Sequence, residues 1–64
     1  MLWVKCLDDG KRYGFVAQTA YEALQKMIYT LNLNRKDDNA VINKTESGLH
    51  LWFEHSGKTY AIAN

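Results

Sequence analysis

The side chains able to bind a metal or act as nucleophiles are few, with one cysteine and two histidines in the chain. His50 and His55 lie in a strand-like segment, and their odd spacing points them to opposite faces of a strand. Zinc ligands must converge on one point, so this pair is poorly placed for a shared ion. We interpret both histidines as solvated or packed against a partner, and we expect no metal and no cofactor.

The remaining reactive residues do not form a catalytic set. Asp8-Asp9 and Asp37-Asp38 lack the alternating oxygen ligands, the glycine and the distal glutamate of a calcium loop. Cys6 is predicted to face the core, where a thiol behaves as a small apolar group. Both serines lie in predicted turns without an oriented acid partner or an oxyanion site. The sequence therefore predicts that this is not an enzyme and has no small-molecule substrate.

Length and composition predict one small globular domain that covers residues 1–64. Apolar residues make up 47% of the chain and charged residues 23%, with a net charge of +1. This charge argues against a strongly basic nucleic-acid clamp. No stretch approaches the roughly 20 apolar residues of a membrane span. A free thiol without a recognisable export signal suggests the cytosol, so we expect a cytoplasmic protein with no membrane partner.

Two strands are predicted at residues 2–7 and 12–17, joined by Asp8-Asp9-Gly10-Lys11. Asp-Gly favours a two-residue hairpin turn, which would place Leu7 opposite Arg12. The residues predicted on one face are Leu2, Val4, Cys6, Tyr13, Phe15 and Ala17. Those predicted on the other face are Trp3, Lys5, Leu7, Arg12, Gly14 and Val16. The first set is apolar and suits a core, whereas the second mixes cations with exposed apolar residues.

A helix is predicted after this hairpin, starting at the capping box Thr19-Ala20-Tyr21-Glu22. Its apolar stripe follows the helical period of 3.6 residues and consists of Ala20, Ala23, Leu24, Met27, Ile28 and Leu31. We expect the helix to end near Asn32, since asparagine tolerates the left-handed conformation of a helix cap.

The C-terminal half predicts a loop at 32–39 and then strands at 40–44, 49–54 and 58–63. Thr45-Glu46-Ser47-Gly48 and Ser56-Gly57 have the composition of turns. With Ser56 and Gly57 as a two-residue loop, Trp52 lies opposite Ala61. The loop segment 34–39 carries two cations and two acids, and we interpret it as a solvated loop.

The predicted order of elements is β-β-α-β-β-β, an α+β domain with one amphipathic helix packed on one face of a small antiparallel or mixed sheet. The predicted core comprises Val4, Cys6, Phe15, Ala23, Leu24, Met27, Ile28, Leu31, Leu51, Phe53, Tyr60 and Ile62.

One short helix cannot cover both faces of the sheet, and the uncovered face is predicted to carry both tryptophans. Tryptophan and arginine dominate binding hot spots, and exposed apolar patches on small proteins often mark interaction sites. The candidate partner-binding residues are Trp3, Lys5, Arg12, Val16, His50 and Trp52. In the alternative interpretation, the tryptophans cap the sheet edge or the helix end, or a one-residue register slip turns Trp52 inward.

These features predict an interaction module that binds a protein partner, or a second copy as a homodimer. The contact would involve the aromatic sheet face or an exposed sheet edge, where free backbone groups accept another strand. The alternative is a weak nucleic-acid binder that stacks bases on the Trp3 and Trp52 side chains.

Overall fold

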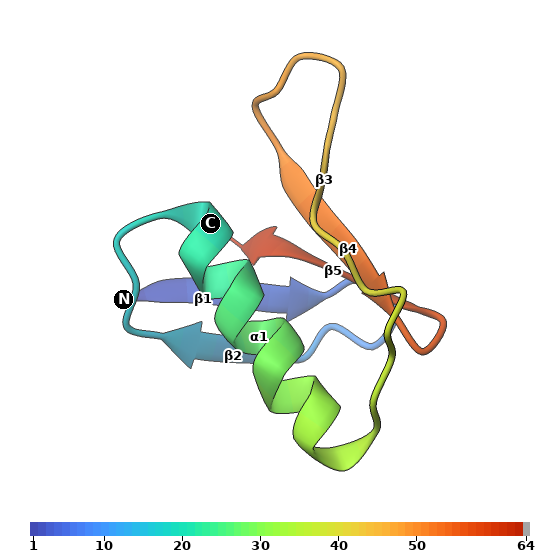
Figure 1. The fold of residues 1–64 in the computed structure, drawn as a ribbon. Helices are drawn as coiled ribbons and strands as arrows, with labels where there is room; N and C mark the ends of the chain where they lie inside the picture. The colour runs from blue at the N-terminus through green and yellow to red at the C-terminus, as the bar shows by residue number, and fades with distance from the viewer. Residues whose placement is uncertain (64) are drawn as a thin grey trace.

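The computed structural model describes residues 1–63 and shows one α-helix packed on a five-stranded antiparallel sheet (Figure 1). The elements are β1 (Leu2–Cys6), β2 (Arg12–Phe15), α1 (Ala20–Asn34), β3 (Asn43–Lys44), β4 (Leu51–His55) and β5 (Lys58–Ala63). The strands lie in the order β2-β1-β5-β4-β3, and every neighbouring pair is antiparallel. The predicted α+β fold and order of elements are confirmed, and the sheet is antiparallel rather than mixed.

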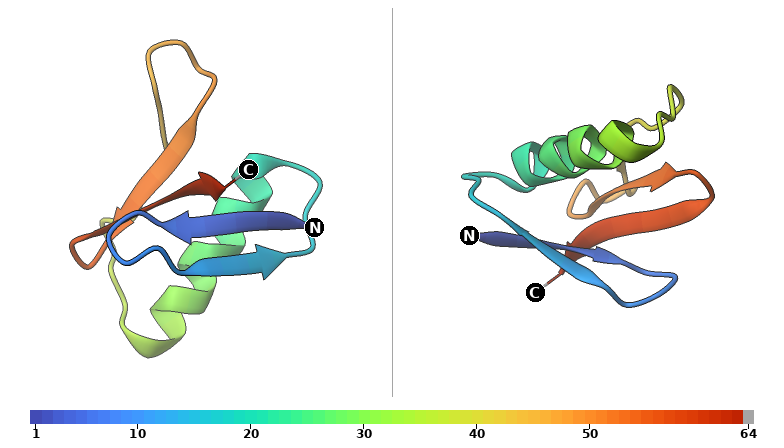
Figure 2. Two further views of the ribbon diagram at one scale, coloured as in Figure 1. Left: turned by 180° about the vertical axis from the view of Figure 1, so that it is seen from behind. Right: turned by 90° about the horizontal axis from the view of Figure 1, so that it is seen from below.

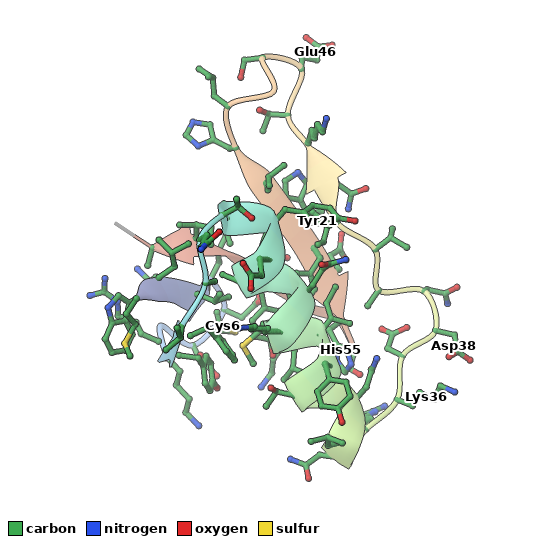
Figure 3. All side chains as sticks on the ribbon, turned by 60° about the vertical axis from the view of Figure 1, so that its left-hand side comes forward. Cys6, Tyr21, Lys36, Asp38, Glu46 and His55 are labelled. Atoms are coloured by element: carbon green, nitrogen blue, oxygen red, sulfur yellow. The ribbon has the colours of Figure 1, made fainter. Side chains whose placement is uncertain are left out.

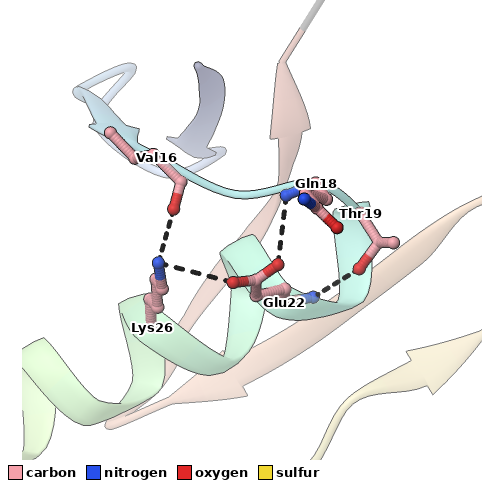
Figure 4. Close-up of polar contacts among 5 residues, drawn as sticks. All are labelled: Val16, Gln18, Thr19, Glu22 and Lys26. Atoms are coloured by element: carbon pink, nitrogen blue, oxygen red, sulfur yellow. Dashed lines mark hydrogen bonds and ion pairs between the residues drawn. The ribbon is translucent and has the colours of Figure 1, made fainter.

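The start of α1 is fixed by its cap and by a contact with the end of β2 (Figure 4). The hydroxyl oxygen of Thr19 accepts a hydrogen bond from the Glu22 amide at 3.1 Å, as the capping box predicts. The Glu22 carboxylate accepts from the Gln18 amide at 3.0 Å, one residue before the expected donor. Lys26 pairs with Glu22 at 3.5 Å and also donates to the Val16 carbonyl, which links the helix to the preceding strand.

The end of α1 differs from the prediction. The helix continues to Asn34, and the Arg35 amide donates to the Leu31 carbonyl at 3.0 Å. Arg35 is extended, so the helix ends without the left-handed cap expected at Asn32. The Asn32 side chain accepts instead from the Asp37 amide at 3.0 Å. Asn32 therefore stabilises the loop after the helix rather than the helix terminus itself.

The first hairpin has a wider turn than the sequence predicts. Lys5 lies opposite Arg12, where the Asp-Gly pattern predicts Leu7 at that place. The turn is closed by the Gly10 amide, which donates to the Cys6 carbonyl at 2.8 Å while Gly10 adopts a φ of 78°. Because the register differs by two residues, each side chain keeps its predicted face.

The second hairpin has the predicted register, with Trp52 opposite Ala61. Ser56 and Gly57 have φ values of 51° and 84°, which is the combination of a type I′ turn. This turn twists in the same sense as the strands it joins. The register excludes the one-residue slip that would turn Trp52 toward the helix.

The strand predicted at 40–44 is reduced to β3, because the residues before it pack against the core. Ala40 and Ile42 lie against the buried cluster, and the Asn43 side chain donates to the Val41 carbonyl at 3.2 Å. β4 begins at Leu51, two residues later than predicted. This edge of the sheet is therefore covered by an irregular segment rather than by a full strand.

The core lies between α1 and the centre of the sheet. All seven of its buried apolar residues belong to the predicted core, and they are Val4, Cys6, Ala23, Leu24, Met27, Phe53 and Tyr60. The rings of Phe53 and Tyr60 stack at 5.0 Å. Burial raises the pKa of Tyr60 to about 12. The predicted core residues that are only half-buried are Phe15, Ile28, Leu31, Leu51 and Ile62. They pack against the buried cluster from its periphery.

A polar network at one end of the core was not predicted. His55 is buried, and its Nε2 atom lies 2.7 Å from Oδ1 of Asn32. That oxygen can only accept, so His55 carries a proton on Nε2. The Asp37 carboxylate accepts from the Ser56 amide at 2.8 Å, and this bond together with one from the Asn39 amide lowers the Asp37 pKa. The interpretation of His55 as solvated or partner-packed is therefore wrong.

Candidate interaction surface

α1 lies on one side of the sheet, and no described element covers the other side (Figure 2). Along β1, exposure alternates between residues facing the helix and residues facing away, as expected for a strand half-buried on one face. We call the uncovered side the open face. Its strand residues are Trp3, Lys5, Arg12, Gly14, Asn43, Trp52, Glu54, Thr59, Ala61 and Ala63.

Part of the predicted site is brought together across the sheet. Lys5 lies between Arg12 on β2 and Ala61 on β5, and Ala61 lies opposite Trp52 on β4. Trp3 belongs to the next row of β1. β5 therefore separates the two tryptophans, and it presents only small side chains between them.

Trp3 has a structural role as well as an exposed surface. A Cβ atom placed on Gly14 would lie 3.0 Å from the Trp3 ring and 2.9 Å from the sulfur of Met1. The indole thus packs against the glycine of the edge strand, an arrangement that stabilises glycine in a sheet. Trp3 caps the sheet edge, as the alternative interpretation proposed, yet 44% of it remains exposed.

Lys5 and Arg12 form a like-charge pair on the open face. The Cys6 amide donates to the Lys11 carbonyl, so the neighbouring pair Lys5–Arg12 is of the non-hydrogen-bonded type, in which side chains lie closest. Like charges directly opposite each other are destabilising. The three ion pairs found among residues 1–63 all involve other lysines. Neither Lys5 nor Arg12 forms an ion pair with a carboxylate of residues 1–63.

A small recess adjoins the pair. Trp3 and Arg12 line a recess of about 240 Å³ on the open face. Sites for drug-sized ligands occupy roughly 300–1,000 Å³, so this recess suits a single side chain or a group of similar size. An indole and a guanidinium on its walls can contact an apolar or an anionic group.

The edge strand β2 has backbone groups free to bind. Hydrogen-bonded and non-hydrogen-bonded pairs alternate along two antiparallel strands, and Cys6–Lys11 is a hydrogen-bonded pair. Tyr13 and Phe15 therefore bond to β1, and the N–H and C=O groups of Arg12 and Gly14 point outward. β2 lies at the end of the sheet, with no described strand beyond it. An edge with such groups accepts another strand readily.

Two predicted site residues lie at the margin. Val16 follows β2 and His50 precedes β4, and both are exposed outside the strands. Of the six predicted residues, Trp3, Lys5 and Arg12 form one cluster, and Trp52 lies across β5 from them.

A second surface, between α1 and the segment leading into β4, was missed. One pocket of about 550 Å³ is lined by Tyr21, Lys44 and Leu49 among others, and Tyr21 also lines a pocket of about 480 Å³ with Tyr29. Figure 3 shows Tyr21 at the helix end nearest β3. The only available signal was two tyrosines on the helix outside its apolar stripe.

Within residues 1–63, no three histidine, cysteine, aspartate or glutamate side chains lie close enough to hold a metal ion. Over the same range, α1 included, no helix has the length and hydropathy needed to cross a membrane. Comparison with protein-family models, curated proteins and solved structures found no match. The open face is therefore interpreted from its own residues.

Proposed function

We propose that this chain is a non-enzymatic interaction module that binds a protein partner through the open face at β1 and β2. The observation that carries the proposal is the Lys5–Arg12 pair, which forms no ion pair within residues 1–63 and lies beside the exposed Trp3 ring. A carboxylate supplied by a partner would offset the repulsion between these cations. Tryptophan and arginine are also the residue types most enriched at the energetic centres of interfaces.

The size of the domain is compatible with this role. Its accessible surface is 4604 Å², and a standard interface buries about 800 Å² per partner, about one sixth of that total. One face of a two-layer domain supplies such an area. The buried free thiol of Cys6 supports a reducing compartment, so a cytoplasmic location is part of the proposal.

The test separates binding from folding by reversing one charge. A phage-displayed library of random linear peptides is selected against the wild-type chain, and the enriched peptides are titrated against Arg12→Glu. Glutamate opposite Lys5 replaces repulsion by attraction, so we expect the variant to be more stable by about 0.2–1 kcal/mol. Binding should nevertheless weaken at least tenfold.

Lys36→Glu is the matched control, since it makes the same charge change on the loop after α1 (Figure 3). We expect this variant to bind the selected peptides within about twofold of wild type. Equal affinities of wild type, Arg12→Glu and a Trp3→Ala variant for all selected peptides would contradict the proposed function.

The second candidate is weak nucleic-acid binding on the same cluster. An exposed indole next to two cations is the arrangement that stacks a base while neutralising phosphates. The probe is a fluorescent single-stranded oligonucleotide of about ten nucleotides. Binding that falls with added salt and with Arg12→Glu would support this candidate, and no binding at low salt would exclude it.

A further inference from the structure

We propose, on the basis of the function proposed above, that the partner contributes an extended acidic peptide segment that pairs with β2 as an additional strand of the sheet. Its acidic side chain would lie beside Arg12 and Lys5 on the open face. Three features of this edge support the proposal: the outward backbone groups, the Lys5–Arg12 pair, which has no ion-pair partner within residues 1–63, and the recess lined by Trp3 and Arg12.

Of the two edges of the described sheet, the one formed by β2 is better able to accept a further strand. On β2, the N–H and C=O groups of Arg12 and Gly14 point away from β1. The opposite edge carries only the two-residue strand β3, and the chain before it packs against the core through Ala40 and Ile42. Figure 1 shows β2 at the border of the sheet without a neighbour beyond it. β2 is therefore the edge strand with which the added strand pairs in this proposal.

The side chains of β2 determine which residue types are favoured at each position of the added strand. Side chains of the partner alternate between the two faces, so the residue opposite Arg12 lies on the open face. An acid there is directly beside Arg12, with Lys5 on the following strand. The residue opposite Gly14 lies beside the Trp3 ring and the Met1 sulfur, which pack over that glycine, and these neighbours favour an apolar group. On the helix side, the half-buried rings of Tyr13 and Phe15 favour apolar neighbours.

The charges favour an acidic peptide over other occupants. β2 of a second copy would bring another arginine and no acid to the edge, since its sequence is Arg-Tyr-Gly-Phe. An oligonucleotide gains affinity by releasing counterions from many cations, whereas the chain has a net charge of +1. A peptide uses both the outward donors and the outward acceptors of β2, as in other complexes formed by strand addition.

Peptide selection followed by backbone methylation tests this inference. Linear peptides of about nine residues, within the usual range of strand lengths, are enriched against wild type and separately against Arg12→Glu. We expect Asp or Glu next to apolar residues in the first set, and Lys or Arg in the second. N-methylation of alternate amides in an enriched peptide should weaken binding at least tenfold, and methylation of the intervening amides should change it less than about twofold.

Each contrary result has a distinct meaning. Failure to enrich any peptide, enrichment without acids, or indifference to N-methylation at every position would overturn strand addition by an acidic segment. If such peptides still lost affinity in Trp3→Ala, the proposed function would stand and only this inference would fail. If light scattering showed a dimer, or an oligonucleotide displaced the peptides and bound more tightly, the occupant would be a second copy or a nucleic acid.

Discussion

Replacement of Leu24 by alanine is expected to leave a large part of the protein unfolded at room temperature. Leu24 has no exposed surface and belongs to the buried cluster that α1 forms with the sheet. Truncating such a leucine costs about 2–5 kcal/mol through lost burial and the cavity left behind. A core of this size rarely supplies more than about 3–5 kcal/mol in total. Urea denaturation followed by circular dichroism measures the loss.

Leu33→Ala is the matched control for this prediction. Leu33 belongs to the same helix, and 68% of it is exposed. The substitution removes the same atoms from a solvated site, so stability should change by less than about 0.5 kcal/mol. If the two variants lost the same stability, the burial of Leu24 between α1 and the sheet would be contradicted.

Replacement of Asn32 by alanine is expected to destabilise the domain by about 1–3 kcal/mol, because it leaves the buried His55 ring and the half-buried Asp37 amide without a partner. Oδ1 of Asn32 accepts from both the His55 ring and the Asp37 amide. Neither donor has an alternative acceptor among the hydrogen bonds of residues 1–63. Thermal unfolding gives the size of the effect, and the histidine proton signals in an NMR titration report on the ring of His55.

Asn34→Ala provides the comparison, since Asn34 is exposed two residues further along the same helix. Alanine has the higher helix propensity at both positions, so any loss of stability at Asn32 is opposed by a small gain. We expect Asn34→Ala to be neutral or slightly stabilising. An equally small effect at both positions would show that the network around His55 contributes little.

Much of the fold could be predicted because local patterns determine it. The alternation of apolar residues assigned the faces of β1 and β2 correctly even though the turn was wider than Asp-Gly implies. A shift of two residues preserves the face of every side chain, so an error in turn geometry did not reach the core. The Thr19 cap and the Ser56-Gly57 turn were confirmed for the same reason, since each depends on adjacent residues.

The features that escaped prediction depend on contacts between distant residues. His55 is buried because Asn32, more than twenty positions earlier in the chain, supplies its acceptor. The strand predicted at 40–44 became mostly irregular because Ala40 and Ile42 pack on the helix and sheet rather than pairing with β4. The alternation placed Trp3, Lys5 and Arg12 on one face, but the predicted register put Leu7, not Lys5, opposite Arg12. The placement of Lys5 opposite Arg12 depends on the exact register of β1 and β2, which the turn residues did not determine.

The most direct test of binding at β1 and β2 is amide hydrogen exchange, measured by NMR with and without a selected peptide. In the free protein, the outward amides of Arg12 and Gly14 should exchange quickly. When the peptide binds, we expect exchange at both amides to slow at least tenfold, because they become part of a ladder. Unchanged exchange at Arg12 and Gly14, with new protection between Val41 and Lys44 instead, would contradict binding at this edge.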